Sequence, residues 1–193
     1  MSVKILAVSG SVRRGSLNQK LLDIAANGAR DAGATVTSIR LSDFVLPIYD
    51  GDLEADHGIP PEVRRLQSVF AEHHALLIAT PEYNGGYSAL LKNALDWVSR
   101  PQKDGTSGVA LLAGKVAAMV SASPGQLGGI RSQLSMRTVL DKLGVMVLPD
   151  AFALGLAHQA FEGEAGLKDK AAEKAVIHVG VALQRAAQRL AIT

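Results

Sequence analysis

The chain contains no cysteine among its 193 residues. This absence excludes disulfide bonds, thiolate metal sites, iron–sulfur clusters and a cysteine nucleophile, and it fits a reducing compartment. Aromatic residues are also scarce, at 4% of the chain, so the core must be built from aliphatic side chains and alanine. Long apolar runs are missing as well, since none approaches the ~18 residues of a membrane span. We therefore expect a soluble, cytoplasmic protein with no membrane partner.

Neither charge sign is in excess, because 20 Lys and Arg against 18 Asp and Glu give a formal net charge of +2. Basic residues are interleaved with acidic ones, and no run resembles a nucleic-acid-binding arm. We expect no nucleic-acid partner. Apolar residues at 48% and charged residues at 20% are typical of a globular protein. The length fits one domain at roughly 100–200 residues per domain, so we expect residues 1–193 to form a single domain.

Short aliphatic segments alternate along the chain with longer amphipathic ones. Strands are predicted at residues 3–8, 35–41, 75–80, 116–121 and 145–148. Helices are predicted from the N-cap Ser16 to a stop at Gly33, and over residues 60–73, 90–98, 130–143 and 172–190. Residues 75–80 (ALLIAT) are apolar on both faces, which suits a parallel sheet covered on both sides. The more polar segment 35–41 is expected at an edge.

Five such alternations predict an α/β protein with a doubly wound, five-stranded parallel sheet and helices on both faces. The longer segments 42–58, 101–114 and 155–167 are rich in Gly, Pro or Asp and are expected to be loops. In sheets of this kind, ligands bind beyond the carboxyl ends of the strands. The strand exits are therefore where functional residues should be sought.

The first strand runs directly into residues 9–18, SGSVRRGSLN, which precede a helix. Hydroxyls, backbone amides and guanidinium groups at a helix N-terminus are typical of a phosphate site. A Walker A loop would need Lys after its second glycine, but Ser16 follows Gly15. The dinucleotide fingerprint G-x-G-x-x-G is absent too, since four residues separate Gly10 from Gly15. A bound monophosphate and a merely capped helix after a polar turn both remain open.

Two more strand exits carry small residues. Residues 81–88 (PEYNGGYS) combine a proline and two glycines with Tyr83 and Tyr87, which supply aromatic surface for a flat ligand. Residues 121–129 (SASPGQLGG) form a third loop of this kind. Taken alone, each could be an ordinary turn. Three together, at consecutive strand exits, favour a shared binding site.

Four motifs of this sequence resemble those of a known family. They are residues 10–18 (GSVRRGSLN), 81–85 (PEYNG), 91–97 (LKNALDW) and 123–131 (SPGQLGGIR). In this order and spacing they resemble the NAD(P)H-dependent FMN reductases, which are flavodoxin-like proteins that include quinone, azo-dye and chromate reductases. The resemblance runs from the first strand to about Pro149.

The resemblance implies a bound FMN in a flavodoxin-like fold. Its phosphate would lie on Ser11, Arg13, Ser16 and Asn18, and its isoalloxazine ring against residues 81–85. The full set of implied cofactor-binding residues is Ser9, Gly10, Ser11, Arg13, Ser16, Leu17, Asn18, Pro81, Glu82, Tyr83, Asn84, Gly85, Ser121 and Ser123. No acid or base is nominated as catalytic, because the flavin carries the chemistry.

The implied activity is electron transfer from NADPH or NADH to a small acceptor: a quinone, an azo compound, a metal oxyanion such as chromate, or free flavin. Donor and acceptor would use one exposed flavin face in turn, which predicts a ping-pong reaction. A homodimer or homotetramer is expected, with residues 90–98 as a reasonable interface surface. Trp97 is expected to belong either to the core or to the surface between subunits, rather than to stack on the flavin. A flavin-binding electron carrier without nicotinamide turnover is the alternative, although carriers tend to be acidic and the pI is near 9.0. A receiver-type regulatory domain is a third possibility; it would need acidic residues where Ser9 and Gly10 stand.

Several further residues have simpler interpretations. Glu82 is expected to be an exposed carboxylate at a turn. Arg131 and Asp150 are expected to be surface charges or contacts between subunits. His73 and His74 lack an H-E-x-x-H spacing, so no metal site is expected. The sequence also has no G-x-S-x-G elbow, which argues against a serine hydrolase.

Overall fold

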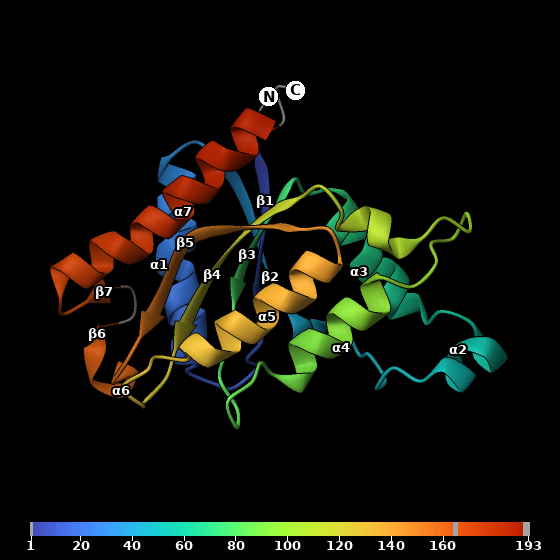
Figure 1. Cartoon of the computed structure of the whole chain (residues 1–193), viewed down its shortest axis with the longest axis horizontal. Helices are drawn as coiled ribbons and strands as arrows, with labels where there is room; N and C mark the ends of the chain where they lie inside the picture. Colours follow the sequence, from blue (N-terminus) through green and yellow to red (C-terminus); the bar gives the residue numbers. More distant parts are fainter. Residues whose placement is uncertain (1, 164–165, 191–193) are drawn as a thin grey trace.

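The computed structural model describes residues 2–163 and 166–190. Its centre is a parallel sheet of five strands in the order β2-β1-β3-β4-β5 (Figure 1). The strands are β1 (Lys4–Ser9), β2 (Thr35–Arg40), β3 (Ala75–Ala79), β4 (Val116–Ala122) and β5 (Met146–Leu154). The predicted doubly wound sheet is confirmed, and the polar segment 35–41 lies at an edge as expected. The strand order reverses between β1 and β3, which is where such sheets form a ligand crevice.

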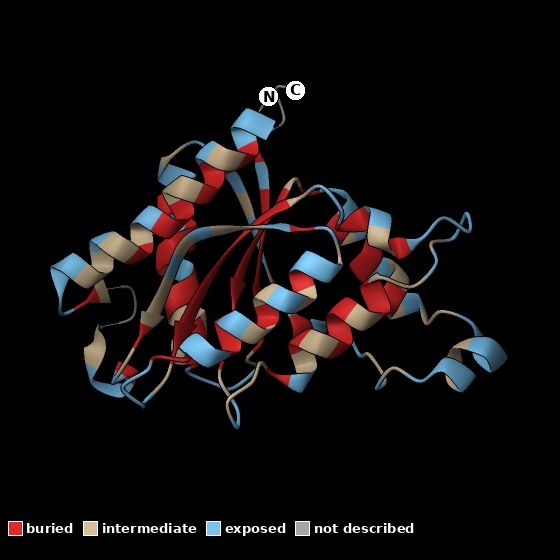
Figure 2. Cartoon of the chain, in the orientation of Figure 1, coloured by how far each residue is buried: buried red, intermediate tan, exposed pale blue. Residues whose placement is uncertain are grey.

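Helices cover both faces of this sheet, as predicted. α1 (Leu17–Asp31) and α7 (Lys170–Leu190) lie on one face, and α3 (Pro61–Ala71), α4 (Ala89–Val98) and α5 (Ile130–Lys142) lie on the other. Every residue of β3 and β4 is buried between the two layers (Figure 2). No helix within residues 2–163 and 166–190 is long and apolar enough to cross a membrane.

Glycines let α1 and α7 approach each other closely. A Cβ at Gly180 of α7 would lie 1.9 Å from the carbonyl oxygen of Ala25, and one at Gly28 of α1 would lie 2.4 Å from that of Ile177. Any larger residue at these positions would force the helices apart. A core poor in aromatic residues is therefore filled by bringing backbones together.

The segments expected to be loops contain short elements. Residues 42–58 hold α2 (Gly51–His57), and residues 155–167 hold α6 (Ala157–Ala160) and the two-stranded β6 (Phe161–Glu162) and β7 (Gly166–Leu167); residues 164–165 lie outside the described part. In the remaining segment, 101–114, residues 108–111 form a 3₁₀ turn. Asp50 is the N-cap of α2, and its carboxylate accepts from the N–H of Asp52 at 2.8 Å. It has no buried residue, so no apolar period revealed it.

β5, the edge strand of the five-stranded sheet, is longer than the predicted 145–148, because Pro149 and Asp150 interrupt the apolar pattern of the sequence. β5 continues to Leu154, and its register against β4 shifts between Ala117 and Met119. A proline is tolerated at such an irregularity of an edge strand, where its missing N–H costs no ladder bond. The guanidinium of Arg137 donates to the carbonyls of Val147 and Leu148 at 2.7 and 2.9 Å.

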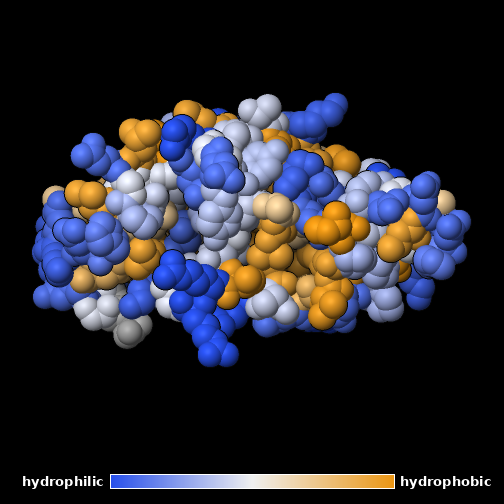
Figure 3. All heavy atoms as spheres, turned by 90° about the horizontal axis from the view of Figure 1, so that it is seen from below, coloured by the Kyte–Doolittle hydropathy of each residue, from blue (hydrophilic) through white to orange (hydrophobic). Residues whose placement is uncertain are grey.

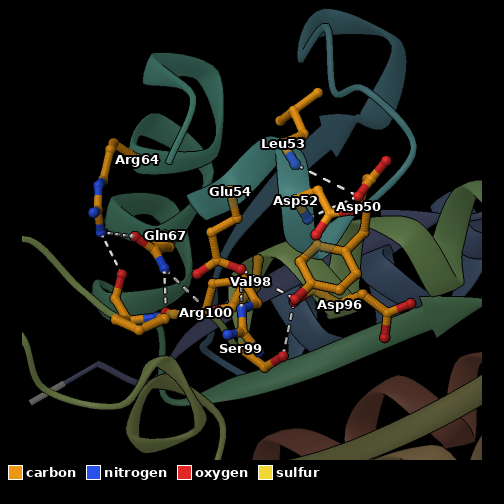
Figure 4. A network of polar contacts seen from close by, with 12 residues as sticks. Asp50, Asp52, Leu53, Glu54, Arg64, Gln67, Asp96, Val98, Ser99 and Arg100 are labelled. Carbon is orange, nitrogen blue, oxygen red and sulfur yellow. Dashed lines mark hydrogen bonds and ion pairs between the residues drawn. The ribbon is translucent and has the colours of Figure 1, made fainter. Parts of the chain in front are cut away.

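The segment before α2 packs on α4 and buries Trp97. The Trp97 indole N–H donates to the Pro47 carbonyl at 2.7 Å, and the ring meets Tyr49 edge-on at 5.0 Å. Farther along, the Tyr49 hydroxyl and the Arg100 Nε both bond Glu54, at 3.1 and 2.7 Å (Figure 4). Trp97 is fully buried within its own chain. Of the two places expected for Trp97, the structure shows the core and not a surface between subunits.

Candidate functional site

The exits of β1, β3 and β4 meet at one edge of the sheet, because these strands are neighbours and run in parallel. Their loops lie at the lower edge of Figure 1, and Figure 3 views the molecule from that side, where strongly hydrophilic side chains project beside an apolar patch. A cavity of about 100 Å³ opens between the loops. It is lined by Ser11, Arg13, Ser16, Leu17, Asn18, Pro81, Glu82, Tyr83, Ala122, Ser123 and Pro124.

The structure thus brings together most of the residues that the sequence assigned to one site. Five of that set, Ser9, Gly10, Asn84, Gly85 and Ser121, do not line the cavity. They shape the surrounding loops instead, as the following contacts show.

The first loop is built to present a helix N-terminus. Ser16 is the N-cap of α1, as predicted, and its hydroxyl accepts from the N–H of Gln19 at 3.2 Å. The first turn of α1 contains no acidic residue. Because the N-terminal end of a helix carries partial positive charge and unpaired N–H groups, this end attracts an anion.

Gly10 is required because two loops touch at this point. A Cβ there would lie 2.7 Å from the Ser88 hydroxyl and 3.0 Å from the Pro81 ring. The Gly10 N–H donates to the Ala79 carbonyl at 2.8 Å, and the Ser9 hydroxyl accepts from the N–H of Ser11 at 3.2 Å. Ser9 and Gly10 therefore fix the start of the loop rather than the wall of the cavity.

Asn18 has a structural task that the sequence did not reveal. Its side-chain amide donates to the Ala122 carbonyl at 2.8 Å and accepts from the Ala122 N–H at 2.9 Å. The residue is buried and ties the start of α1 to the end of β4. The resemblance placed this side chain on a phosphate, whereas in the structure both ends of its amide are already bonded.

The second loop is a tight turn. Tyr83 and Gly86 exchange two backbone hydrogen bonds, of 2.9 and 3.0 Å, around Asn84 and Gly85. These two central residues have φ of +52° and +81°, the left-handed pair that an Asn-Gly type I′ turn requires. The turn leaves Tyr83 56% exposed beside the cavity. An exposed tyrosine on a rigid turn provides a flat apolar surface.

Glu82 is not the exposed carboxylate that was expected, since its side chain is only 9% exposed. One carboxylate oxygen accepts from Nε of Arg131 at 2.8 Å and also from Nη2, and the other accepts from the Arg131 backbone N–H at 3.2 Å. The hydrogen bond from Arg131 lowers the pKa of Glu82 below its ordinary value. Because Gly129 gives α5 no side-chain cap, the Glu82 carboxylate caps that helix from another loop.

Arg131 and Asp150 are thus not merely surface charges. Arg131 forms this ion pair within the chain. Asp150 lies 3.2 Å from the Nε2 of His178, a pair that joins β5 to α7. Neither contact needs a second subunit.

His73 and His74 lie far from the site, at the amino end of the sheet. His74 Nδ1 accepts from the N–H of Lys4 at 3.0 Å, and His73 Nδ1 lies 2.6 Å from the Val69 carbonyl. Burial, followed by the charge of Lys115, lowers the pKa of His74. Within the described ranges, no three His, Asp or Glu side chains are arranged to hold a metal ion.

The third loop is fastened by buried hydrogen bonds. The Ser121 hydroxyl donates to the Gly128 carbonyl at 2.7 Å, and the Gln133 amide donates to Ser121 at 2.6 Å and to the Phe152 carbonyl at 2.8 Å. Ser132 adds a bond of 3.0 Å to the carbonyl of Thr80, after β3. The sequence did not single out Gln133 or Ser132, because their partners lie on other strands. The Ser121 hydroxyl, assigned to a cofactor, serves the loop itself.

A second cavity, of about 330 Å³, lies on the other side of the first loop. It extends between that loop, α1 and the end of β2, and it includes Arg40 and Ser42. Ser11, Arg13 and Ser16 line both cavities. Arg40 is the last residue of the polar edge strand β2, and no motif in the sequence singled it out.

Comparison with known proteins gives a consistent picture. The family model of NADPH-dependent FMN reductase matches residues 3–159. A Pseudomonas aeruginosa protein named NAD(P)H-dependent FMN reductase is 38% identical over 191 residues, covering 97% of each chain. An NADPH:quinone oxidoreductase of Arabidopsis thaliana is 33% identical, covering 97% of this chain and 93% of that one.

Among solved structures, the flavoenzyme NAD(P)H:(acceptor) oxidoreductase FerB of Paracoccus denitrificans superposes with a TM-score of 0.80 at 28% identity, covering 97% of this chain and 98% of that one. A flavodoxin from the domain Archaea superposes with a TM-score of 0.60 at 11% identity, covering 96% and 99%. At that identity the flavodoxin shows the fold alone. The predicted flavodoxin-like architecture is confirmed.

Proposed function

The chain belongs to the NADPH-dependent FMN reductase family, and from this premise we infer that it is a flavoprotein oxidoreductase that uses FMN and NAD(P)H and reduces quinones. The observation that carries this conclusion is the meeting of three strand exits around one cavity. That cavity combines a helix N-terminus, the Arg13 guanidinium and the Tyr83 ring. These groups match the phosphate and the flat ring of FMN.

We propose that the FMN phosphate is held at the start of α1. Ser11 and Ser16 offer hydroxyls, and the Arg13 guanidinium has no hydrogen-bond or ion-pair partner within the described residues. A free guanidinium beside a helix N-terminus can bind a phosphate through charge-assisted hydrogen bonds. The one carboxylate in the cavity, Glu82, is neutralised by Arg131 and so does not repel the phosphate.

The isoalloxazine ring of FMN would lie against residues 81–85, and Ser123, which directly follows β4, would contact it from the neighbouring loop. FMN, when bound, supplies the hydride chemistry, so the protein's own contribution is binding, orientation and electrostatics. Tyr83 provides a contact surface, and the rigid turn behind it fixes that surface in place. Backbone N–H groups of the loops can stabilise negative charge on the ring.

We propose a ping-pong reaction, in which the nicotinamide and the acceptor use the same exposed face of the bound flavin in turn. NADPH and NADH are both candidate donors, and the acceptors would include quinones, azo compounds, metal oxyanions such as chromate, and free flavin. Initial rates at varied NADPH and quinone should give parallel double-reciprocal lines, whereas intersecting lines would contradict the mechanism. Absence of NADPH oxidation with every acceptor would leave a passive electron carrier.

We also propose that a homodimer or homotetramer completes the site of this single domain, in the cytoplasm. With Trp97 buried, the exposed apolar surface beside the site is the start of α5. Leu127, Ile130 and Leu134 are 57, 44 and 61% exposed there. Light scattering should show an oligomer at assay concentration, and a fully active monomer would contradict the proposal.

A further inference from the structure

The larger cavity, of about 330 Å³, lies on the side of the β1–α1 loop that faces away from the proposed ring site. β2 and β3 flank β1 on opposite sides, so the end of β2 is remote from the loops that follow β3 and β4. In the sheet register, Arg40 of β2 is paired with Ser9 of β1. One strand spacing, about 4.8 Å, therefore separates their backbones.

The walls of this cavity are cationic and rich in hydroxyl groups. Arg13 and Arg40 are exposed, and within the described residues neither guanidinium has a hydrogen-bond or ion-pair partner. Ser42 adds a hydroxyl on the β2 side. Asp23, the one carboxylate among the lining residues, accepts from the Gln19 amide at 2.9 Å. The cavity is therefore suited to an anion.

The second cavity contains groups that the proposed FMN phosphate site does not use. It has a single phosphate, and the groups proposed to hold it, Ser11, Arg13 and Ser16, stand at the boundary between the two cavities. Arg40 and Ser42 line only the larger one. The Arg40 guanidinium is therefore available to an anionic group other than the FMN phosphate.

Parallel α/β sheets that bind dinucleotides give a physical precedent. In those sheets a residue beyond the β1–α1 turn contacts the adenosine ribose, and an arginine nearby can accommodate a 2′-phosphate. Because the β1–α1 turn of this chain is the proposed site of the FMN phosphate, the comparison concerns the arginine alone. Here Arg40 is the last residue of β2, and β2 also neighbours β1. We propose that Arg40 binds the 2′-phosphate of NADPH and makes the enzyme prefer NADPH to NADH. This proposal rests on the proposed NAD(P)H-dependent function.

The test compares Arg40→Ala with the wild-type holoenzyme. Loss of one charge-assisted bond should lower the ratio of kcat/KM for NADPH to that for NADH about 10-fold or more. Calorimetric titration of the holoenzyme with adenosine 2′,5′-bisphosphate and with 5′-AMP provides a readout that does not depend on turnover. The bisphosphate should bind more tightly to the wild type, and Arg40→Ala should remove that difference. Arg40→Lys, which keeps the charge, should retain part of it.

Arg14→Ala is the matched control, because Arg14 is an exposed neighbour that lines neither cavity. Equal binding of the two adenosine nucleotides to the wild type, or an unchanged NADPH to NADH ratio in Arg40→Ala, would overturn the proposal. So would a loss of FMN affinity in Arg40→Ala, which would assign the cavity to the flavin phosphate. A wild type that oxidises neither nicotinamide would instead refute the proposed function.

Discussion

The two ends of the site are built in different ways. The end formed by residues 11–16 is open: Val12, Arg13 and Arg14 are exposed, and a Cβ on Gly15 would have no atom within 4 Å. The end formed by residues 81–86 and 123–129 is cross-linked by side-chain hydrogen bonds. They include those between the Glu82 carboxylate and Arg131 of α5, and the buried bond from the Ser121 hydroxyl to the Gly128 carbonyl.

The contrast fits what we propose that each end binds. A phosphate is attracted by charge over a distance, and long guanidinium side chains can close on it from several directions. A flat ring needs a surface that is already in place, because loose loops would lose entropy when they order around it. We expect the open end to supply affinity and the cross-linked end to supply geometry.

The largest effect is expected when alanine replaces a glycine, and the loss of stability should differ between the two ends. Gly128 and Gly15 have similar left-handed φ, +61° and +66°, so alanine should cost each roughly 1–2 kcal/mol. At Gly128 the new Cβ would also lie 2.6 Å from the backbone of Ala153, which adds roughly 1–3 kcal/mol of overpacking. Urea unfolding should show a clearly larger loss for Gly128→Ala. Equal losses would mean that the two loops do not differ in packing.

Flavin affinity should respond most at the open end. Arg13→Ala would remove a charge-assisted bond worth roughly 1.5–3 kcal/mol, so FMN affinity should fall about 10- to 150-fold. Arg14→Ala should retain FMN, because Arg14 lines neither cavity. Titration of each apo-protein with FMN measures both. Equal affinities of Arg13→Ala and the wild type would show that the phosphate lies elsewhere.

A smaller, pH-dependent effect is expected at the cross-linked end. The pKa of Glu82 is lowered in the folded protein from its ordinary 4.5, so its pairing stabilises the fold above that pH. This contribution is lost as the pH falls through the lowered folded-state pKa. Glu82→Gln should cost about 1 kcal/mol of unfolding free energy at neutral pH, and the difference should vanish in acid.

The matched control is Glu62→Gln, whose partner Arg65 sits on an exposed helix surface. Exposed ion pairs contribute little, so this variant should stay within about 0.5 kcal/mol of the wild type. If Glu82→Gln lost no more unfolding free energy than Glu62→Gln at any pH, the Glu82–Arg131 pair would not stabilise this end of the site.

The smallest effect is expected at Ser16, whose hydroxyl caps α1 and is also proposed to bind the phosphate. Ser16→Ala removes the N-cap of α1, which costs about 1 kcal/mol of stability. If the same hydroxyl also binds the phosphate, FMN affinity should fall about 5-fold, corresponding to about 1 kcal/mol. Thermal melting of the apo-protein and FMN titration separate the two losses. A stability loss with unchanged FMN affinity would restrict Ser16 to capping.

The sheet and the position of the site could be predicted because their signals are local. Residues 75–80 are apolar on both faces, and Ser16 stands directly before an amphipathic helix, so a short window of sequence is sufficient for each. Parallel strands then bring their exits together, and separate motifs become one site.

The cross-links could not be predicted because their partners are far apart along the chain. Glu82 and Arg131 are 49 positions apart, and Asn18 and Ala122 are 104. Nothing near Glu82 in the sequence distinguishes a helix cap from an exposed carboxylate. The sequence also left open whether the core or a second subunit covers Trp97, since the segment at Pro47 that covers it has no regular apolar period.

The exposed edge of β5 limits how readily a second chain could add a strand to the sheet. The outer edge of a sheet offers unpaired N–H and C=O groups on which a second chain can add a strand, which is a route to aggregation. On β5, the Arg137 guanidinium already occupies the carbonyls of Val147 and Leu148, and the next residue, Pro149, has no N–H to offer. An incoming strand would have to displace the arginine and would still miss a donor, so this edge discourages the growth of fibrils.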